Sequence, residues 1–226
     1  MSIQTWIIEK LKEDNTSAHS RKSRTTVQAM GKHGVRVIRP GQQDAVGYCV
    51  DPDPNPFTVE MLEEAIEELP GARMVIVTRR VVDPDVYSRS SELGACVDTF
   101  GGFSRAITSL DDISDYVHPE ETYFRKRMQS TRAVISVNRQ GYRAWELRRI
   151  NRLRSLTVVT HDRYELTDAS FAEVLDQYPK LDIDALVVTN PSARGFGARV
   201  VTSSRNAGVP LYKLDDFISK VRDPWT

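Results

Sequence analysis

The chain has 226 residues, 40% of them hydrophobic, and its 31 basic and 31 acidic side chains cancel to a formal charge of zero. A chain of this length buries one large core or two small ones, and its overall charge points to no class of partner. The sequence contains no run of 18 apolar residues, and residues 1–15 lack the basic start of a signal peptide. We therefore expect a cytoplasmic protein without a membrane partner.

The two cysteines, Cys49 and Cys96, lie in apolar runs typical of strands. Buried thiols in a reducing compartment are the expectation. Two cysteines and four scattered histidines do not supply the four regularly spaced ligands of a zinc site. We therefore expect no cofactor, with Mg²⁺ needed only if the chain is a nuclease.

Hydrophobic spacing and turn residues define the elements of the first half. In order, we expect a helix at 3–11, a short helix near 26–32, strands at 35–38 and 45–50, a helix capped by Thr58, a strand at 74–78, a polar helix closed by Gly94, a strand at 95–99 and a helix at 103–110.

The second half repeats this order, and residues 185–221 are a second version of residues 74–110. Thr58 and Thr167 stand 109 positions apart, and Gly94 and Gly208 stand 114 apart. We expect an α/β protein of two similar βαβαβα units that arose by internal duplication, forming either a pseudo-dimer or one continuous mixed or parallel sheet. The expected divisions are an N-terminal helix with a basic segment (1–43), a first unit (44–117), a linker with a second basic segment (118–154) and a second unit (155–226).

Charge is unevenly distributed along the chain. Residues 1–43 carry eight basic and three acidic groups, and residues 44–122 carry five and seventeen. Residues 123–154 carry ten basic groups and one acidic group, and residues 155–226 carry eight and ten. Each unit is thus preceded by a basic segment.

The basic segment 123–154 combines nine arginines and a lysine with four aromatic residues. Arginine suits bidentate phosphate contacts and aromatic rings stack on bases, so this segment is the predicted DNA contact. A helix after Trp145 is expected to carry Arg148, Arg149, Arg152 and Arg154 mostly along one side. The candidates are Arg125, Lys126, Arg127, Arg143, Trp145, Arg148, Arg149 and Arg152. In the alternative, the arginines cover an acidic unit, either as a homo-oligomer contact or against another protein.

An apolar strand, a polar helix, a short strand and an acidic helix start occupy residues 186–190, 197–207, 209–213 and 215–218. This pattern resembles the C-terminal half of restriction-endonuclease-like domains of the Mrr type, and the resemblance implies a DNA-associated protein. Such nucleases place an Asp and a Glu/Gln-x-Lys motif on adjacent strands. No acid or glutamine stands two positions before any of the eight lysines. The expectation is therefore phosphate-backbone binding without catalysis.

Two further groups of residues are candidates for a site at the carboxyl ends of strands. His161, Asp162 and Glu165 have side chains that hold divalent cations, as in a nuclease with a non-standard site, and a solvated turn before Thr167 is the alternative. Anion or nucleotide binding is predicted in the loop after residue 189 and at the matching end of the first half, where flexible loops are the alternative. These candidates are Asn190, Ser192, Arg194 and Gly197, with Arg79 and Arg80.

Overall fold

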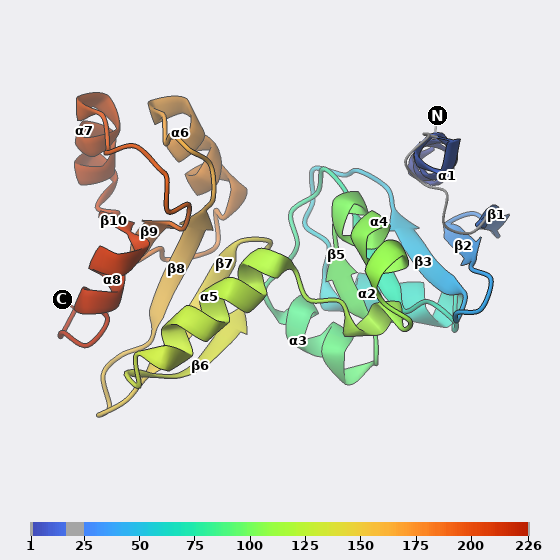
Figure 1. The fold of residues 1–226 in the computed structure, drawn as a ribbon, viewed down its shortest axis with the longest axis horizontal. Coiled ribbons are helices and arrows are strands. Elements are labelled where there is room, and N and C mark those ends of the chain that lie inside the picture. The colour runs from blue at the N-terminus through green and yellow to red at the C-terminus, as the bar shows by residue number, and fades with distance from the viewer. Residues whose placement is uncertain (1, 17–24, 226) are drawn as a thin grey trace. The chain divides into compact units, whose positions relative to one another are not determined.

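The computed structural model describes residues 2–16 and 25–225, and the chain divides into two compact units, Met1–Tyr116 and Val117–Thr226. Each unit contains one five-stranded sheet with helices on both faces (Figure 1). The expectation of two similar α/β units is confirmed. The alternative of one continuous sheet does not hold for the described strands, because they form two sheets. Among the described residues, no helix is long and apolar enough to cross a bilayer.

The first unit begins with a helix, continues as an antiparallel hairpin, and ends with two parallel crossovers. Its strands lie in the order β1-β2-β3-β4-β5, with β1, β2 and β3 antiparallel and β3, β4 and β5 parallel. The elements are α1 (Ile3–Thr16), β1 (Thr26–Met30), β2 (Gly34–Ile38), β3 (Ala45–Val50), α2 (Val59–Glu68), β4 (Met74–Val77), α3 (Asp85–Glu92), β5 (Cys96–Asp98), α4 (Phe100–Ser109) and the 3₁₀ turn η1 (Ile113–Asp115).

The second unit repeats this topology. Its strands lie in the order β6-β7-β8-β9-β10, again antiparallel from β6 to β8 and parallel from β8 to β10. The elements are α5 (Pro119–Ser130), β6 (Val134–Arg139), β7 (Ala144–Arg149), β8 (Leu156–His161), α6 (Asp168–Gln177), β9 (Ala185–Val188), α7 (Ala198–Ala207), β10 (Leu211–Lys213) and α8 (Leu214–Lys220).

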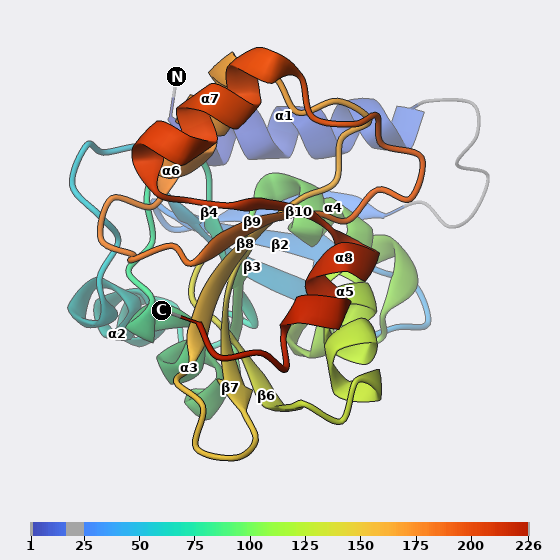
Figure 2. The same ribbon diagram turned by 90° about the vertical axis from the view of Figure 1, so that its left-hand side faces the viewer.

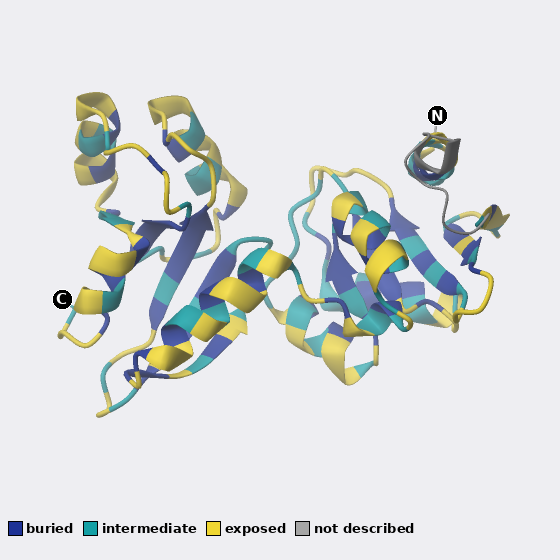
Figure 3. Ribbon diagram, viewed as in Figure 1, coloured by how far each residue is buried: buried dark blue, intermediate teal, exposed yellow. Residues whose placement is uncertain are grey.

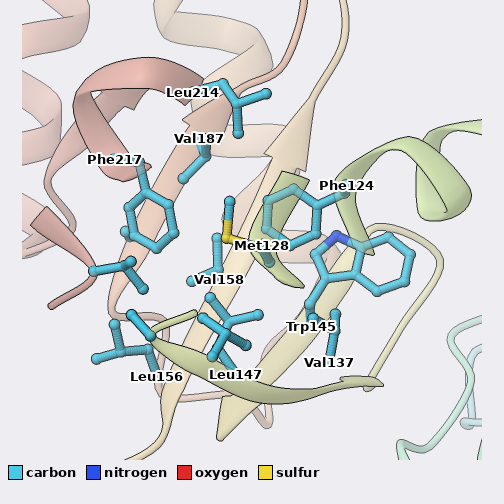
Figure 4. Close-up of a cluster of buried hydrophobic side chains, with 14 residues drawn as sticks. Phe124, Met128, Val137, Trp145, Leu147, Leu156, Val158, Val187, Leu214 and Phe217 are labelled. Carbon is cyan, nitrogen blue, oxygen red and sulfur yellow. The ribbon is translucent and has the colours of Figure 1, made fainter. Parts of the chain in front are cut away.

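Each sheet has two apolar layers. In the second unit, α5 and α8 cover one face through Phe124, Met128 and Phe217 (Figure 4). Helices α6 and α7 lie next to each other over the other face and contribute Phe171 and Val200 (Figure 2). The strands between these layers, β8 and β9, are almost entirely buried (Figure 3). An unbroken apolar sequence in these strands follows from burial on both sides.

Two expected helices are strands. Residues 26–30 form β1, in which Val27 is the one buried residue and its neighbours are exposed. Residues after Trp145 continue as β7, whose buried Trp145, Leu147 and Arg149 alternate with the more exposed Glu146 and Arg148. This spacing of two places the arginines on opposite faces of a strand rather than along one side of a helix. The basic segments thus supply a helix and a hairpin to the sheets.

The repeat extends to individual buried side chains. Arg39 is 3% exposed and donates to the backbone carbonyls of residues 43, 107, 110 and 111. Arg149 is 4% exposed and donates to the carbonyls of residues 154, 221 and 223. Each guanidinium therefore ties the end of a hairpin to the segment that follows the last helix of its own unit.

The expected helix caps are also present in both units. The hydroxyls of Thr58 and Thr167 accept hydrogen bonds from the third residue after them. Gly94 and Gly208 both end a helix with a φ of 70°, a conformation that glycine adopts without strain. These caps fix where the crossover helices begin and end, and hence where the loops between strands and helices lie.

Candidate nucleic-acid interface

The first arginines of the basic segment are engaged by groups of their own unit. Arg125 Nε donates to the Glu121 carboxylate at 2.7 Å, and its Nη1 donates to the carbonyl of Val137 in the outer strand β6. Arg127 pairs with Asp215 at the start of α8. The alternative to DNA binding was that these arginines cover acidic groups of another unit or subunit. In the structure, the acidic groups that they cover belong to their own unit.

Two of the DNA-contact candidates lie inside the core. Trp145 is 1% exposed, its ring centroid is 5.8 Å from that of Phe124, and its indole Nε1 donates to Thr160 at 3.1 Å (Figure 4). Arg149 is also buried, and the loss of hydration lowers the pKa of its guanidinium. Neither side chain reaches a nucleic acid while the unit is folded.

Exposed arginines gather at one end of the second unit. The amide of Ile150 donates to the carbonyl of Ala133 at 3.0 Å, which joins the β7–β8 turn to the turn after α5 (lower left in Figure 1). Arg222, which follows α8, donates to the carbonyl of Thr131 in the same turn. Three distant stretches of sequence therefore meet here. We name the resulting set the basic end: Arg132, Arg148, Arg152 and Arg222.

The carboxylates at this end are paired with other cations. Asp184 pairs with Arg154 at 2.7 Å, and Asp223 pairs with Lys220 at 3.3 Å. Within the described part of the chain, the arginines of the basic end form no ion pair. They therefore add uncompensated positive charge, and their planar guanidinium groups match the geometry of phosphate oxygens.

Two members of the basic end have an unusual backbone. Arg132 and Arg152 have φ values of 56° and 57°, in the left-handed region that favours glycine. For an L-amino acid this conformation costs about 1–2 kcal/mol, because the Cβ approaches the following carbonyl. Strained residues cluster at functional sites, and consecutive positive φ values, as at Asn151 and Arg152, also characterise tight hairpin turns.

A second polar cluster lies at the opposite end of the same sheet. Arg143, just before β7, places Nε 3.1 Å from Glu120 of α5 and donates Nη2 to Asp162, just after β8, at 2.9 Å. Thr189, just after β9, donates to the other oxygen of Glu120 at 3.2 Å. The guanidinium of Arg143 is therefore enclosed by two carboxylates and is not available to a phosphate.

Burial and charge act differently on the two carboxylates of this cluster. Burial raises the pKa of Glu120, and Arg143 only partly opposes this effect. Asp162 is more exposed, and although burial works against it, the hydrogen bonds and charge of Arg143 lower its pKa. Asp162 is thus the better partner of Arg143, and Glu120 is the carboxylate whose charge is disfavoured.

The predicted metal ligands are not brought together. His161 is buried, burial lowers its pKa, and its Nε2 lies 3.5 Å from the carbonyl of Glu165. Asp162 turns to Arg143. In residues 2–16 and 25–225, no three His, Cys, Asp or Glu side chains are grouped as metal ligands. These three positions therefore form the end of a strand and its turn.

The predicted anion-binding residues hold loops in place. Asn190 donates to the carbonyl of Asp162 at 3.0 Å and accepts from the amide of Ser192 at 2.9 Å, and Arg194 lies over the ring of Tyr164. Gly197 caps α7 without a side-chain bond.

In the first unit, Arg80 turns back onto the carbonyl of Asn55 and the ring of Phe57. Arg79 is exposed, with a φ of 56°. The matching strand ends of the two units therefore present different groups.

Several residues of these clusters were not predicted from the sequence. Arg132 and Arg222 lie 90 positions apart in the sequence, and only the contact of Arg222 with Thr131, in the turn after α5, brings them to the same end. Glu120 was assigned to a linker, although Pro119 at the first helical position is a signal for a helix start. For Tyr164, the sequence offers no indication of a role other than its position after a strand.

Comparisons with known proteins return no relative. No family model matches the chain, and no curated protein or solved structure matches it. The resemblance to restriction-endonuclease-like domains of the Mrr type therefore rests on the sequence pattern alone.

Proposed function

We propose that this protein binds DNA through phosphate contacts made by the basic end of the second unit. The observation that carries the proposal is the gathering of Arg132, Arg148, Arg152 and Arg222 from three stretches of sequence at one exposed end. Uncompensated arginines attract the phosphate backbone and release its counterions, which drives binding of any sequence. The resemblance to DNA-associated domains favours DNA as the polyanion.

This mode of binding reads no bases. Of the aromatic residues near the basic end in sequence, Phe124 and Trp145 are buried in the core, and Trp225 is partly buried against Tyr212 and Phe217, with its indole Nε1 donating to the carbonyl of Lys220. The groups left to contact DNA are the guanidinium groups of the basic end. We therefore expect binding that is independent of sequence and strongly dependent on salt. The proposal leaves out Arg125, Arg127 and Arg143, which pair with carboxylates, and the buried Arg149. It adds Arg132 and Arg222, which are exposed and have no carboxylate partner among the described residues, although Arg222 also donates to the carbonyl of Thr131.

The test is fluorescence anisotropy with a labelled duplex of about 20 base pairs between about 50 and 200 mM salt. Each of Arg132→Gln, Arg148→Gln and Arg152→Gln should weaken binding and reduce the slope of log K against log salt by about 1. Lys12→Gln, at an exposed position of α1, is the charge-matched control and should leave the slope unchanged. Absence of binding at low salt, or a triple variant that keeps the wild-type slope, would rule out this function.

A further inference from the structure

An exposed tyrosine stands at the opposite end of the second sheet, and an arginine holds it in place. Tyr164 follows β8 and is 52% exposed. Arg194, from the loop after β9, places its guanidinium carbon 5.4 Å from the centroid of the Tyr164 ring. Its backbone amide donates to the carbonyl of Tyr164 at 2.9 Å, and its Nε lies 3.4 Å from the phenol oxygen. The ring is thus fixed on one side and open to solvent on the other.

The loops that carry this pair are ordered by hydrogen bonds of their own. Asn190 bridges the two loops through the carbonyl of Asp162, and Lys213 donates to the carbonyl of Ala193 at 3.3 Å. Loops fixed in this way lose little conformational entropy when a ligand binds. The pair is therefore organised before any ligand arrives.

The ring stands between residues of both charges. Arg194 contacts it, the exposed Arg163 precedes it, and the exposed Glu165 follows it. An open aromatic face beside arginines offers stacking for a flat ring and attraction for a phosphate attached to it. Among chemical groups, a nucleobase on its sugar-phosphate combines these two properties.

We propose that the Tyr164–Arg194 pair is a stacking platform for an unpaired nucleobase. The basic end and the platform stand at opposite ends of β8, whose six residues span about 20 Å. This length corresponds to about six base pairs of B-DNA. A duplex that is held at the basic end and runs along β8 brings its single-stranded tail to the platform, so the second unit prefers tailed DNA to blunt DNA. The preference for tailed duplexes rests on the proposed function, whereas the stacking itself does not.

The experiment compares three labelled DNAs by anisotropy: a blunt duplex, the same duplex with a short thymidine tail, and the same duplex with an abasic tail. The wild type should bind the thymidine-tailed duplex at least about fivefold more tightly than the other two. Tyr164→Ala should abolish this preference and leave blunt-duplex affinity unchanged, and Tyr164→Phe should retain it. Tyr123→Ala is the matched control, because Tyr123 is 41% exposed on α5.

Equal affinity of the wild type for tailed and blunt duplexes, or a tail preference that survives Tyr164→Ala, would overturn the inference. If the blunt duplex does not bind at all, the basic end has failed as a DNA site, and the platform is then tested with a free thymidine oligonucleotide. Binding of this oligonucleotide that Tyr164→Ala weakens at least about fivefold supports the platform. No binding, or binding that the substitution leaves intact, overturns it.

Discussion

Gly41 and Arg152 are each the third residue of a hydrogen-bonded hairpin turn, 39–42 in the first unit and 150–153 in the second, with φ values of 78° and 57°. The first unit uses the residue that this backbone prefers, and the second unit uses a cation instead. The turns also differ in that Asn151, before Arg152, has a positive φ of 56°, whereas Pro40 precedes Gly41. Arg39 and Arg149 make the same kind of backbone contacts nearby. The arginine therefore adds charge at the expense of stability, which is the trade-off expected where a side chain serves binding.

Arg152→Gly should raise the free energy of unfolding by about 0.5–1 kcal/mol, because glycine relieves the left-handed strain but adds entropy to the unfolded chain. The same substitution should weaken DNA binding. Urea denaturation and anisotropy on one preparation measure both effects. The reciprocal variant, Gly41→Arg, should lower stability by about 1–2 kcal/mol. A loss of stability on Arg152→Gly would contradict this account of the turn.

Arg39→Ala and Arg149→Ala should each destabilise the protein by about 2–4 kcal/mol, because several buried carbonyls lose a charged donor at once. Urea unfolding followed by circular dichroism measures both. Arg148→Ala, one position from Arg149 but exposed, is the control and should change stability by less than about 0.5 kcal/mol. A large loss of stability at only one of the two positions would contradict the prediction that Arg39 and Arg149 have the same role.

The stability of Glu120→Gln relative to the wild type should increase as the pH rises. A carboxyl with a raised folded pKa stabilises the fold below its unfolded pKa of about 4.3, and this contribution is lost as pH rises through the folded value. The melting temperature of the variant minus that of the wild type should therefore be more positive at about pH 7 than at about pH 4. Asp162→Asn should behave oppositely and cost stability at neutral pH, since the pKa of Asp162 is lowered. A pH-independent difference for Glu120→Gln would show that its charge is not disfavoured.

The two thiols should react at different rates. Burial raises the pKa of Cys49 to about 12, and its side chain is fully enclosed, whereas Cys96 is partly exposed, in contrast to the expectation that both are buried. A thiol reagent at neutral pH should label Cys96 readily and Cys49 only when the first unit opens. Mass spectrometry of Cys49→Ser and Cys96→Ser separates the two rates. Fast labelling of Cys49 in the native protein would show that β3 is accessible.

The crossover part of each unit and strands β2 and β3 could be predicted from the sequence, whereas β1, β6 and β7 could not. Runs such as Met74–Val77 and Ala185–Val188 are buried on both faces, so their apolar character alone identifies them. Strand β7 is buried on one face and carries arginines on both, and Arg149 is buried only because backbone carbonyls surround it. Hydrophobic periodicity contains no signal for such a residue.

The candidate site was predictable in composition but not in place. The excess of arginine in residues 123–154 is evident from the sequence, yet the acids that neutralise Arg125, Arg127 and Arg143 become neighbours only in the fold. Arg132 and Arg152 remain exposed because they lie in turns. Arg222 joins them because it donates to the carbonyl of Thr131, about 90 positions earlier in the sequence. Long-range contacts of this kind leave no local pattern in the sequence.

Strand β6 is the outer strand of its sheet. The guanidinium of Arg125 donates a hydrogen bond to the carbonyl of Val137 and so covers part of the open backbone of this strand. An uncovered outer strand pairs with other chains and aggregates. Replacing every arginine of the basic segment at once would therefore cause aggregation. The failure of the aggregated protein to bind DNA would then be mistaken for the loss of a phosphate contact. Variants for binding assays should keep Arg125 in place and be checked for dispersity first.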